Sequence, residues 1–332
     1  MSTSAVPPVV ATPSPWHRGE IALQKAAGAY ERMNGVGHRL VRDYMPDQHR
    51  QFFAQLPFIV AGTVDEHGDP WATLIAGQPG FMQTPDATTL FIERARDPLD
   101  PADAGMSDGA SIGLLGIELH TRRRNRLNGT VRRSSPDSFD IVVGQSYGNC
   151  PQYIQLRDFE WTRDPQTPSK VAPQAMSHLD ARAREMITTA DTFFVASYVD
   201  LDGGQRQVDV SHRGGRPGFV RVGLDAADDT LTIPDFAGNQ FFNTLGNFMV
   251  NPRAGLVFVD FERGDLLQLT GTAQVVLDDP EIATFRGAER LWRFTPRRSV
   301  YRADALPLRW TFEPGGWSPE SLRMGNWPQR QS

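Results

Sequence analysis

The stretch Phe58-Ile-Val-Ala-Gly-Thr-Val-Asp65 returns later in the chain as Phe193-Phe-Val-Ala-Ser-Tyr-Val-Asp200. Two further matches follow in the same order: Pro79-Gly80-Phe81 with Pro217-Gly218-Phe219, and Leu127-Asn-Gly-Thr130 with Leu269-Thr-Gly-Thr272. Matching residues are 135 positions apart in the first match and 142 in the last. A unit of this length, repeated once with small insertions, predicts a duplicated domain rather than a short-period solenoid. The seam between two such domains is a natural place for a ligand.

Composition sets limits on the class of protein. The chain has 332 residues, 39% hydrophobic and 22% charged, which is enough for two hydrophobic cores. Its net charge of −5 gives no sign of a nucleic-acid partner. Cys150 is the only cysteine and the seven histidines show no metal-ligand spacing, so no disulfide or metal site is expected. No apolar run approaches the roughly 18 residues of a membrane span, and residues 1–15 resemble a flexible tail more than a signal peptide. We therefore expect a cytoplasmic protein without a membrane partner.

Each copy is expected to begin with helices. Residues 20–42 have helical character interrupted by Gly35-Val36-Gly37, and Pro46 begins a further helix. In the second copy, Ser177-His-Leu-Asp180 is typical of a capping box at the start of a helix.

Short β-rich runs with turn signals between them follow in both copies. The expected strands are 58–64, 71–75, 90–93, 112–119 and 126–132 in the first copy, and 193–199, 207–211, 219–222, 231–233, 255–261 and 266–276 in the second. Asp279-Pro280 is expected to begin a C-terminal helix that ends near Leu291, before a loop-rich tail. Many short antiparallel strands predict a barrel or a sandwich. The sequence has neither a G-x-G-x-x-G nor a P-loop pattern, which argues against the nucleotide-binding α/β folds.

One predicted helix distinguishes the two copies. In the second copy, Asn239 is expected to cap a helix that runs to Val250, with Asn243 and Thr244 away from its apolar side. At the same place the first copy carries residues 97–105, a loop of acids and prolines. Because the copies differ here, we expect one working site, in the second copy, rather than two.

The segment Val208-Asp-Val-Ser-His-Arg-Gly-Gly-Arg-Pro-Gly-Phe219 suits an anion. Ser211 offers a hydroxyl group, Arg213 a planar set of donors, and Gly214 with its neighbour bare backbone amides, and together these groups can hold a phosphate. The alternative is a polar hairpin turn that binds nothing. The matching segment 71–78 of the first copy lacks the His-Arg pair, and this asymmetry favours the phosphate site.

The order of these elements resembles the pyridoxamine 5′-phosphate oxidase-related split barrels, and in particular a longer, tandem branch of that family. The resemblance covers most of residues 16–290 and rests on an ordered set of motifs: Trp16-His-Arg-Gly-Glu20, Gly148-Asn-Cys-Pro-Gln-Tyr-Ile154, Ser211-His-Arg-Gly-Gly215 and Asn251-Pro252-Arg253-Ala254. It implies a mainly β fold with α-helices (α+β), in which two tandem split β-barrels form an intrachain pseudo-dimer. The implied domains are a flexible tail (1–15), a first split-barrel repeat with N-terminal helices (16–165) and a second repeat with a C-terminal helix and a loop-rich tail (166–332).

The resemblance also implies a cofactor, FMN, held mainly by the second repeat with its ring between the barrels. The implied contacts are Val210, Ser211, His212, Arg213, Gly214, Asp235, Asn239, Asn243, Thr244, Gln152 and Tyr153. Asn243 and Thr244 stand where the family has an Arg-Lys pair, and the family's C-terminal substrate-phosphate motif is not recognisable, so vitamin B6 is not the expected substrate. His212 either tunes the cofactor or is structural, and Asp235 is expected to cap the helix rather than to meet the ring.

The implied function is an oxidoreductase in which reduced FMN passes hydride or electrons to a small acceptor. The small-molecule substrate, an electron donor such as NAD(P)H, and the pairing of two chains into a homodimer stay open. One alternative is a non-enzymatic protein that binds or senses FMN or another cofactor. Another is a haem-binding or haem-degrading split barrel with His212 or His178 as axial ligand. Arg122-Arg-Arg-Asn-Arg126 is interpreted as a solvated hairpin tip rather than a site for an acidic substrate or NADPH, and Cys150 as packed rather than catalytic.

Overall fold

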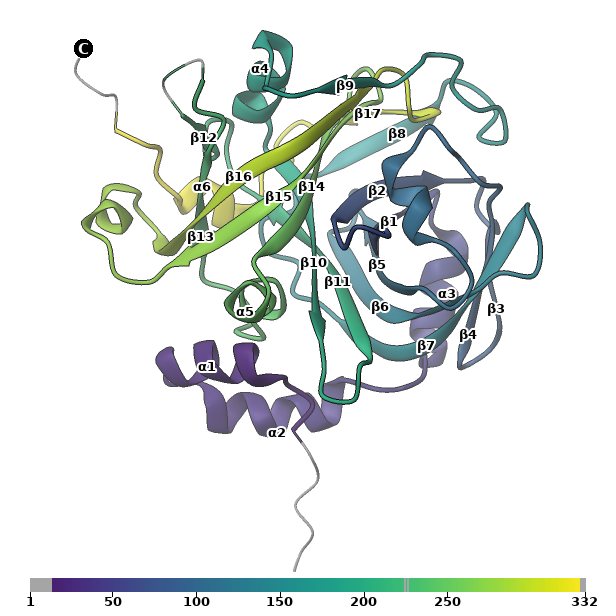
Figure 1. Ribbon diagram of the computed structural model, residues 1–332, viewed down its shortest axis with the longest axis horizontal. Helices are drawn as coiled ribbons and strands as arrows, with labels where there is room; N and C mark the ends of the chain where they lie inside the picture. The colour runs from purple at the N-terminus through teal and green to yellow at the C-terminus, as the bar shows by residue number, and fades with distance from the viewer. Residues whose placement is uncertain (1–13, 224, 226, 329–332) are drawn as a thin grey trace, which may run out of the picture.

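The computed structural model describes residues 14–328, except 224 and 226 (Figure 1). The expected flexible tail, residues 1–15, therefore lies almost entirely outside the described residues. The first large sheet consists of β1 (Phe58–Val64), β2 (Pro70–Ala76), β3 (Met82–Asp86), β4 (Thr89–Glu93), β5 (Ser111–Glu118), β6 (Arg123–Arg132) and β7 (Ser138–Gly148). The second consists of β10 (Thr192–Asp200), β11 (Arg206–Gly214), β12 (Arg221–Val222), β13 (Leu231–Phe236), β14 (Arg253–Asp260), β15 (Asp265–Val276) and β16 (Ala288–Arg302).

The two sheets have the same strand order. The first runs β2-β1-β5-β6-β7-β4-β3, and the second runs β11-β10-β14-β15-β16-β13-β12, with antiparallel pairing throughout. Each strand of the first sheet thus has a counterpart at the same place in the second. This correspondence confirms the predicted fold class, a mainly β protein built from two tandem split barrels.

Helices and shorter elements surround the sheets. The helices are α1 (Arg18–Ala26), α2 (Tyr30–Leu40), α3 (Asp47–Gln55), α4 (Ala181–Thr189), α5 (Asn243–Val250) and α6 (Pro319–Arg323), with 3-10 helices η1 (Pro101–Gly105) and η2 (Pro280–Thr284). Strand β9 (Gln174–Met176) pairs with β16, and β8 (Arg157–Trp161) pairs with β17 (Leu308–Phe312). In the second repeat α5 takes the place that η1 has in the first, between the fourth strand of the repeat and the fifth. Among the described residues no helix is long and apolar enough to cross a membrane.

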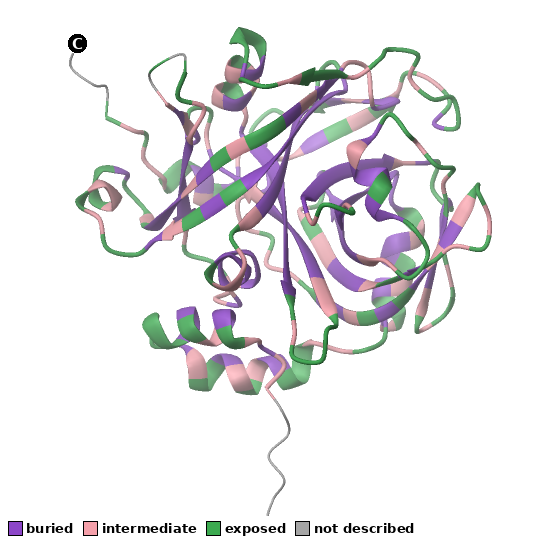
Figure 2. Cartoon of the chain, in the orientation of Figure 1, coloured by how far each residue is buried: buried purple, intermediate pink, exposed green. Residues whose placement is uncertain are grey.

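The central strands are hydrophobic on both faces because both faces are buried. Successive side chains of a strand point to opposite sides. Ile59 of β1 therefore packs in the core of the first barrel, while Val60 packs in a core between the barrels. Phe193 and Phe194 of β10 divide in the same way between the core of the second barrel and the core between the barrels. Figure 2 shows the buried stretches running through the middle of both sheets.

The two repeats pack against each other reciprocally. Strand β11 lies against β5 and β6 of the first repeat, and β2 lies against β14 and β15 of the second. The approach is close enough to require glycine: a Cβ atom on Gly113 of β5 would lie 2.6 Å from the carbonyl oxygen of Val208. A Cβ on Gly255 of β14 would lie 2.3 Å from the carbonyl oxygen of Pro70. The chain therefore forms the predicted intrachain pseudo-dimer.

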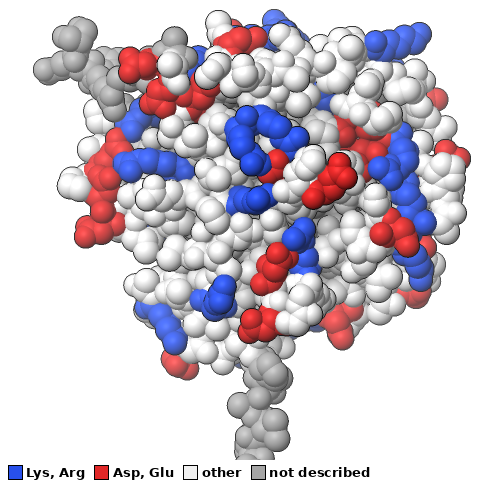
Figure 3. Space-filling model, in the orientation of Figure 1, with Lys and Arg blue, Asp and Glu red and all other residues white. Residues whose placement is uncertain are grey.

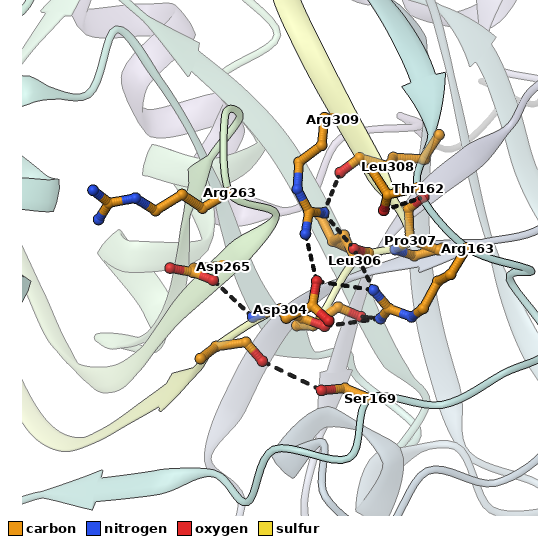
Figure 4. A network of polar contacts seen from close by, with 12 residues as sticks. Thr162, Arg163, Ser169, Arg263, Asp265, Asp304, Leu306, Pro307, Leu308 and Arg309 are labelled. Atoms are coloured by element: carbon orange, nitrogen blue, oxygen red, sulfur yellow. Dashed lines mark hydrogen bonds and ion pairs between the residues drawn. The ribbon is translucent and has the colours of Figure 1, made fainter.

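The linker between the repeats comprises residues 149–180, from the end of β7 to the start of α4. It is bonded to the C-terminal part of the chain. The backbone N–H of Thr162 donates to the carbonyl of Pro307, and the Arg163 guanidinium lies 3.0 Å from Asp304 and also donates to the carbonyl of Leu306 (Figure 4). Arg309 of β17 pairs with the same carboxylate. The domain boundary expected after residue 165 lies within this linker.

On the face shown in Figure 3, basic and acidic side chains are interspersed.

Several expected helix boundaries are wrong. The N-terminal helices are separated at Gly28, whose φ of 64° favours glycine, while Gly35 and Gly37 lie inside α2. Asp180 caps α4 by accepting from the N–H of Ala183, so the box expected at Ser177 does not form. The cause in both cases is local: a left-handed residue and a closer acceptor decide where a helix begins or ends.

Two expectations near the C-terminus are also wrong. Helix α5 begins at Asn243, after Phe242 in a left-handed conformation, so Asn239 is not its cap; its Oδ1 instead accepts from the N–H of Phe241. The helix expected from Asp279 to Leu291 is only the short η2, and residues 288–302 form the long strand β16. The tail is correspondingly less irregular than expected, with β16, β17 and α6. Strand β16 forms because β13 and β15 both pair with it, and such long-range pairing overrides local helical signals.

Candidate functional site

A pocket opens at the seam between the repeats. Its walls come from β11, β13 and α5 of the second repeat, from β5 and β6 of the first, and from the linker segment that follows β7. It contains about 940 Å³ of space between atoms, and this space includes open solvent. Ten of the eleven expected contacts line it: Ser211, His212, Arg213, Gly214, Asp235, Asn239, Asn243, Thr244, Gln152 and Tyr153. Val210 does not, because it packs in the core between the barrels.

Several of the expected donors are already engaged with protein partners. The hydroxyl of Thr244 donates to Ser211 at 2.9 Å, and Arg126 also donates to Ser211. The amide of Asn243 donates to the buried carboxyl of Glu20 at 2.6 Å. The start of α5 is therefore bonded to neighbouring residues. Ser211, Asn243 and Thr244 have fewer unused hydrogen-bonding groups for an anion than the sequence predicted.

Arg126 belongs to a neutralised, buried network. Its Nη1 lies 3.0 Å from the carboxylate of Asp209, which is fully buried. The amides of Asn128 and Asn247 donate to the same carboxylate at 2.8 and 2.9 Å. A buried carboxylate with a cation and two further donors is satisfied, so the charge of Arg126 is balanced inside the protein.

Arg124, two residues earlier on the same strand, has no acid partner among the described residues. Its Nη1 lies 3.1 Å from Nδ1 of the buried His212. Arginine cannot accept a hydrogen bond, so Nδ1 accepts and the ring hydrogen of His212 sits on Nε2. Burial, followed by the charges of Arg124, Arg213 and Arg157, holds the pKa of His212 well below its ordinary value. Burial also lowers the pKa of Arg124 to about 10. His212 is thus a neutral donor beside an arginine without a counter-ion.

Five buried N–H groups on the walls of the pocket have no hydrogen-bond partner among the described residues. They are Nε of Arg124, Arg126 and Arg213, Nδ2 of Asn149 and Nε2 of His212. No buried side-chain acceptor on the same walls lacks a partner in the described chain. Each unmet donor costs about 1–3 kcal/mol, so such a concentration is complementary to a ligand rich in acceptor oxygens.

Strands β13 and β16 contribute an ion-pair group to the pocket walls, and part of this group was not predicted from the sequence. Asp235 accepts from Arg290 at 2.5 Å and lies 3.6 Å from Arg213, and Arg290 also pairs with Glu289 at 2.8 Å. Asp235 is therefore an ion-pair partner rather than the expected helix cap. Arg290 was missed because β16, which carries it, looked helical in sequence.

The linker segment closes one side of the pocket. Tyr153 has a left-handed φ of 64°, its hydroxyl donates to the carbonyl of Ala237 at 2.9 Å, and its ring lies 5.3 Å from that of Phe236. A Cβ on Gly214 would lie 2.0 Å from the carbonyl oxygen of Tyr153, so only glycine fits under the linker. Cys150 is half-buried and also lines the pocket.

The interpretation of residues 122–126 as a solvated hairpin tip is wrong. Arg122 donates to the carbonyls of Ile154, Gly316 and Trp317, and Arg124 and Arg126 line the pocket. The alternation of Arg124 and Arg126, two residues apart, was the available signal: such a pair shares one face of a strand. His178, the other histidine considered for haem, has a 71% exposed side chain beside Asp229 and does not line the pocket.

The matching place at the other side of the seam holds a smaller pocket whose walls are joined by ion pairs. There Arg302 pairs with Asp97 at 2.6 Å and with Asp100 at 2.7 Å. Gln268 stands where the first repeat has Arg126, and it donates to Asp100 and to the carbonyl of Ala72. Internal ion pairs thus occupy this side of the seam.

Two matched antiparallel sheets with a polar pocket between them define a tandem split-barrel protein. Residues 45–166 match the family model described as pyridoxamine 5′-phosphate oxidase. The match confirms the predicted relationship to this family, over the first repeat.

Comparison with solved structures finds matches at low identity and low TM-score. A putative pyridoxamine 5′-phosphate oxidase from Lactobacillus delbrueckii is 14% identical over 32% of this chain and 95% of its own, with a TM-score of 0.26. HupZ from Group A Streptococcus is 17% identical over 35% of this chain and 89% of its own, with a TM-score of 0.26. HutZ, the haem storage protein from Vibrio cholerae, is 17% identical over 38% of this chain and 95% of its own, with a TM-score of 0.26. None of the curated proteins matches the chain in sequence.

Proposed function

We propose that this protein binds FMN in the seam pocket and acts as an FMN-dependent oxidoreductase. The observation that carries the proposal is the set of five unpartnered N–H donors on the walls of one pocket. A phosphate group offers several acceptor oxygens and a charge of about −2, which fits donors that include an arginine without a counter-ion.

The chain's own residues would divide the ligand between them. Arg124, His212 and Arg213 would hold the phosphate, with the amide of Asn149 as a further donor. Gln152 and Tyr153 of the linker would lie along the ring. When bound, FMN supplies hydride or electron transfer to a small acceptor, after reduction by NAD(P)H or another donor. The protein supplies position, charge balance and shelter from water.

A haem site in the same pocket has weaker support. His212 is the histidine that lines the pocket, and an axial ligand must offer a nitrogen lone pair to the iron. Since Arg124 donates to Nδ1 at 3.1 Å, Nε2 carries the hydrogen and acts as a donor. This arrangement suits an acceptor oxygen better than iron.

Titration with FMN, followed by flavin fluorescence and the visible absorbance band, tests the proposal. Wild-type protein should quench the flavin and bind it in a one-to-one ratio with the chain. Arg213→Ala should weaken binding about tenfold or more, because a charged phosphate contact is lost. Arg216→Ala is the matched control: Arg216 contacts Asn326 and the carbonyl of Met324 outside the pocket, and its loss should leave the affinity unchanged.

The outcomes separate the alternatives. Failure of wild-type protein to bind FMN would overturn the proposal, and a Soret band with added haem that disappears in His212→Ala would favour the haem site. If FMN binds but neither NAD(P)H nor dithionite-reduced flavin leads to reduction of an added acceptor, the protein is a flavin-binding or sensing protein rather than an enzyme.

A further inference from the structure

The motif at residues 16–20 forms the start of α1, which packs against α5 behind the pocket wall (Figure 1). The two helices touch backbone to backbone: a Cβ on Gly19 would lie 2.0 Å from the carbonyl oxygen of Gly246. Next to this contact, the carboxyl group of Glu20 lies against Asn243, the first residue of α5. Glu20 is only 1% exposed. It is therefore separated from the pocket by a single side chain.

Both carboxyl oxygens of Glu20 are used. Oε1 accepts from the amide of Asn243 at 2.6 Å, and Oε2 accepts from the backbone N–H of His17 at 2.9 Å, which completes a capping box for α1. Glu20 thus links the start of α1 to the start of α5. The orientation of Asn243, which lines the pocket, depends on this contact.

The charged and titratable groups that face Glu20 come from four elements. Asp209 of β11, Arg126 of β6, Tyr147 of β7 and His17 beside α1 surround it. Burial and then the charge of Asp209 raise the pKa of Glu20 to about 8, against the hydrogen bonds from His17 and Asn243 and the charge of Arg126. Burial lowers the pKa of His17 and raises that of Tyr147, so both are neutral near pH 7. Since Asp209 already balances Arg126, no unpaired cation faces Glu20 within residues 14–328 as far as the structure describes them.

We propose that Glu20 is a positioning residue of the seam pocket: as a neutral acid it holds Asn243 in place, and its ionisation weakens binding of a phosphate-bearing ligand. The proposal rests on the proposed function, because it concerns the same pocket. A negative charge behind Asn243 repels a phosphate and also opposes the charge of Asp209. By linkage, binding of the anion must in turn favour the protonated form of Glu20.

The test is the affinity for FMN between pH 6.5 and 9. Wild-type affinity should fall about threefold or more as pH rises from 7 to 9, because a group that titrates in this range is coupled to the ligand. Glu20→Gln keeps an uncharged hydrogen-bonding side chain, so its affinity should stay nearly constant over the same range. Glu20→Ala loses the contact with Asn243 and should bind more weakly at every pH.

Glu118→Gln is the matched control. Glu118 is also a buried glutamate, but it lies on β5 and bonds to Gln55 and Thr121 away from the pocket. This variant should follow the wild-type pH profile. If Glu20→Gln shows the same fall in affinity as wild-type protein, the proposal is wrong.

Failure of the proposed function gives a different pattern. If wild-type protein does not bind FMN at any pH, the assignment of FMN fails, and inorganic phosphate then serves as the probe. The rise in melting temperature that phosphate produces should shrink from pH 7 to pH 9 in wild-type protein but not in Glu20→Gln. Equal behaviour of the two proteins, or no effect of phosphate at pH 7, would overturn the role of Glu20.

Discussion

Arg124 and Arg126 lie two residues apart on one face of β6 but are in opposite electrostatic situations. Arg126 is bonded to Asp209, whereas in the described part of the chain the hydrogen-bond partner of Arg124 is the neutral His212. One guanidinium therefore holds the seam together, and the other is available to a ligand. The difference arises from what β11 places opposite each of them.

Replacing Arg126 should mainly lower the stability of the protein, and replacing Arg124 should mainly lower its affinity for FMN. Arg126→Gln leaves Asp209 buried without its cation, and it should lower the free energy of unfolding by about 3–5 kcal/mol in urea titrations. Arg124→Gln removes a cation without a counter-ion, so the free energy of unfolding should stay the same or rise slightly, while affinity for FMN falls about tenfold. Equal destabilisation by both changes would show that Arg124 is structural.

The raised pKa of Glu20 also predicts how the free energy of unfolding depends on pH. Its pKa is about 8 in the folded protein and 4.5 ordinarily, so between these values the folded state keeps a proton that the unfolded state releases. This contribution to stability is therefore present at pH 4.5 and is lost as pH rises to about 8. Glu20→Gln has no titrating group at this position. The free energy of unfolding of this variant relative to wild-type protein, measured in urea, should therefore increase by a few kcal/mol from pH 5 to pH 8. An advantage that does not change with pH would contradict it.

At the residue scale the sequence predicted the local half of the candidate site. Ser211, His212 and Arg213 are contiguous, so their position on one strand and turn could be inferred. Arg124 and Arg290 could not, because each reaches the pocket through pairing between distant segments. The polar contacts of Asn243 with Glu20, 223 residues away, likewise have no local signal.

The crossing of α1 and α5 fixes one wall of the pocket. Gly19 and Gly246 let the two backbones meet, and larger residues would push the helices apart. Any movement of α5 also moves Asn243 and Thr244.

Gly19→Ala should therefore destabilise the protein by about 1–3 kcal/mol and weaken FMN binding as well. Gly35→Ala is the control at the same residue type: it lies inside α2 with open space around it, and it should stabilise by about 0.5–1 kcal/mol through helix propensity. Thermal unfolding and FMN titration of both variants measure the two effects. A Gly19→Ala protein with unchanged stability would show that the helices can separate without cost.

At the element scale, the strands with strong alternation or continuous apolar character were predicted close to their observed ends, as with β1. The start of β16, as far as Leu291, was predicted as helix because Asp279-Pro280 is a helix-start signal, used here only for η2. The rest of β16 was expected in the loop-rich tail. Strand β16, which is 15 residues long, is held by partner strands on both edges. Local chemistry does not reveal such partners, and β7 was missed for the same reason.

At the scale of the whole molecule, the core between the barrels should make the two repeats unfold together. Phe194 is fully buried in this core. Phe194→Ala should cost about 3–5 kcal/mol and keep a single transition, with tryptophan fluorescence and far-UV circular dichroism coinciding in urea. Two separated transitions would mean that each repeat is stable alone.

The duplication could be predicted from the sequence, because three motifs recur in one order. The shared strand order of the two sheets agrees with this prediction. The closure of the other side of the seam was only indirectly visible, as an acidic loop at residues 97–105. Its partner, Arg302, comes from the other repeat, 205 residues from Asp97. Only the folded pseudo-dimer brings the two together.

The exchange of Arg126 for Gln268 at related positions has a consequence for evolution. In an assembly of two identical subunits, every substitution appears twice, so both interfaces must tolerate it. Covalent joining removes that constraint: the gene can change one copy while the other keeps its residue. Because the two copies belong to one chain, Gln268 and the ion pairs of Arg302 can stabilise one side of the seam while Arg124 and Arg126 line a polar pocket at the other.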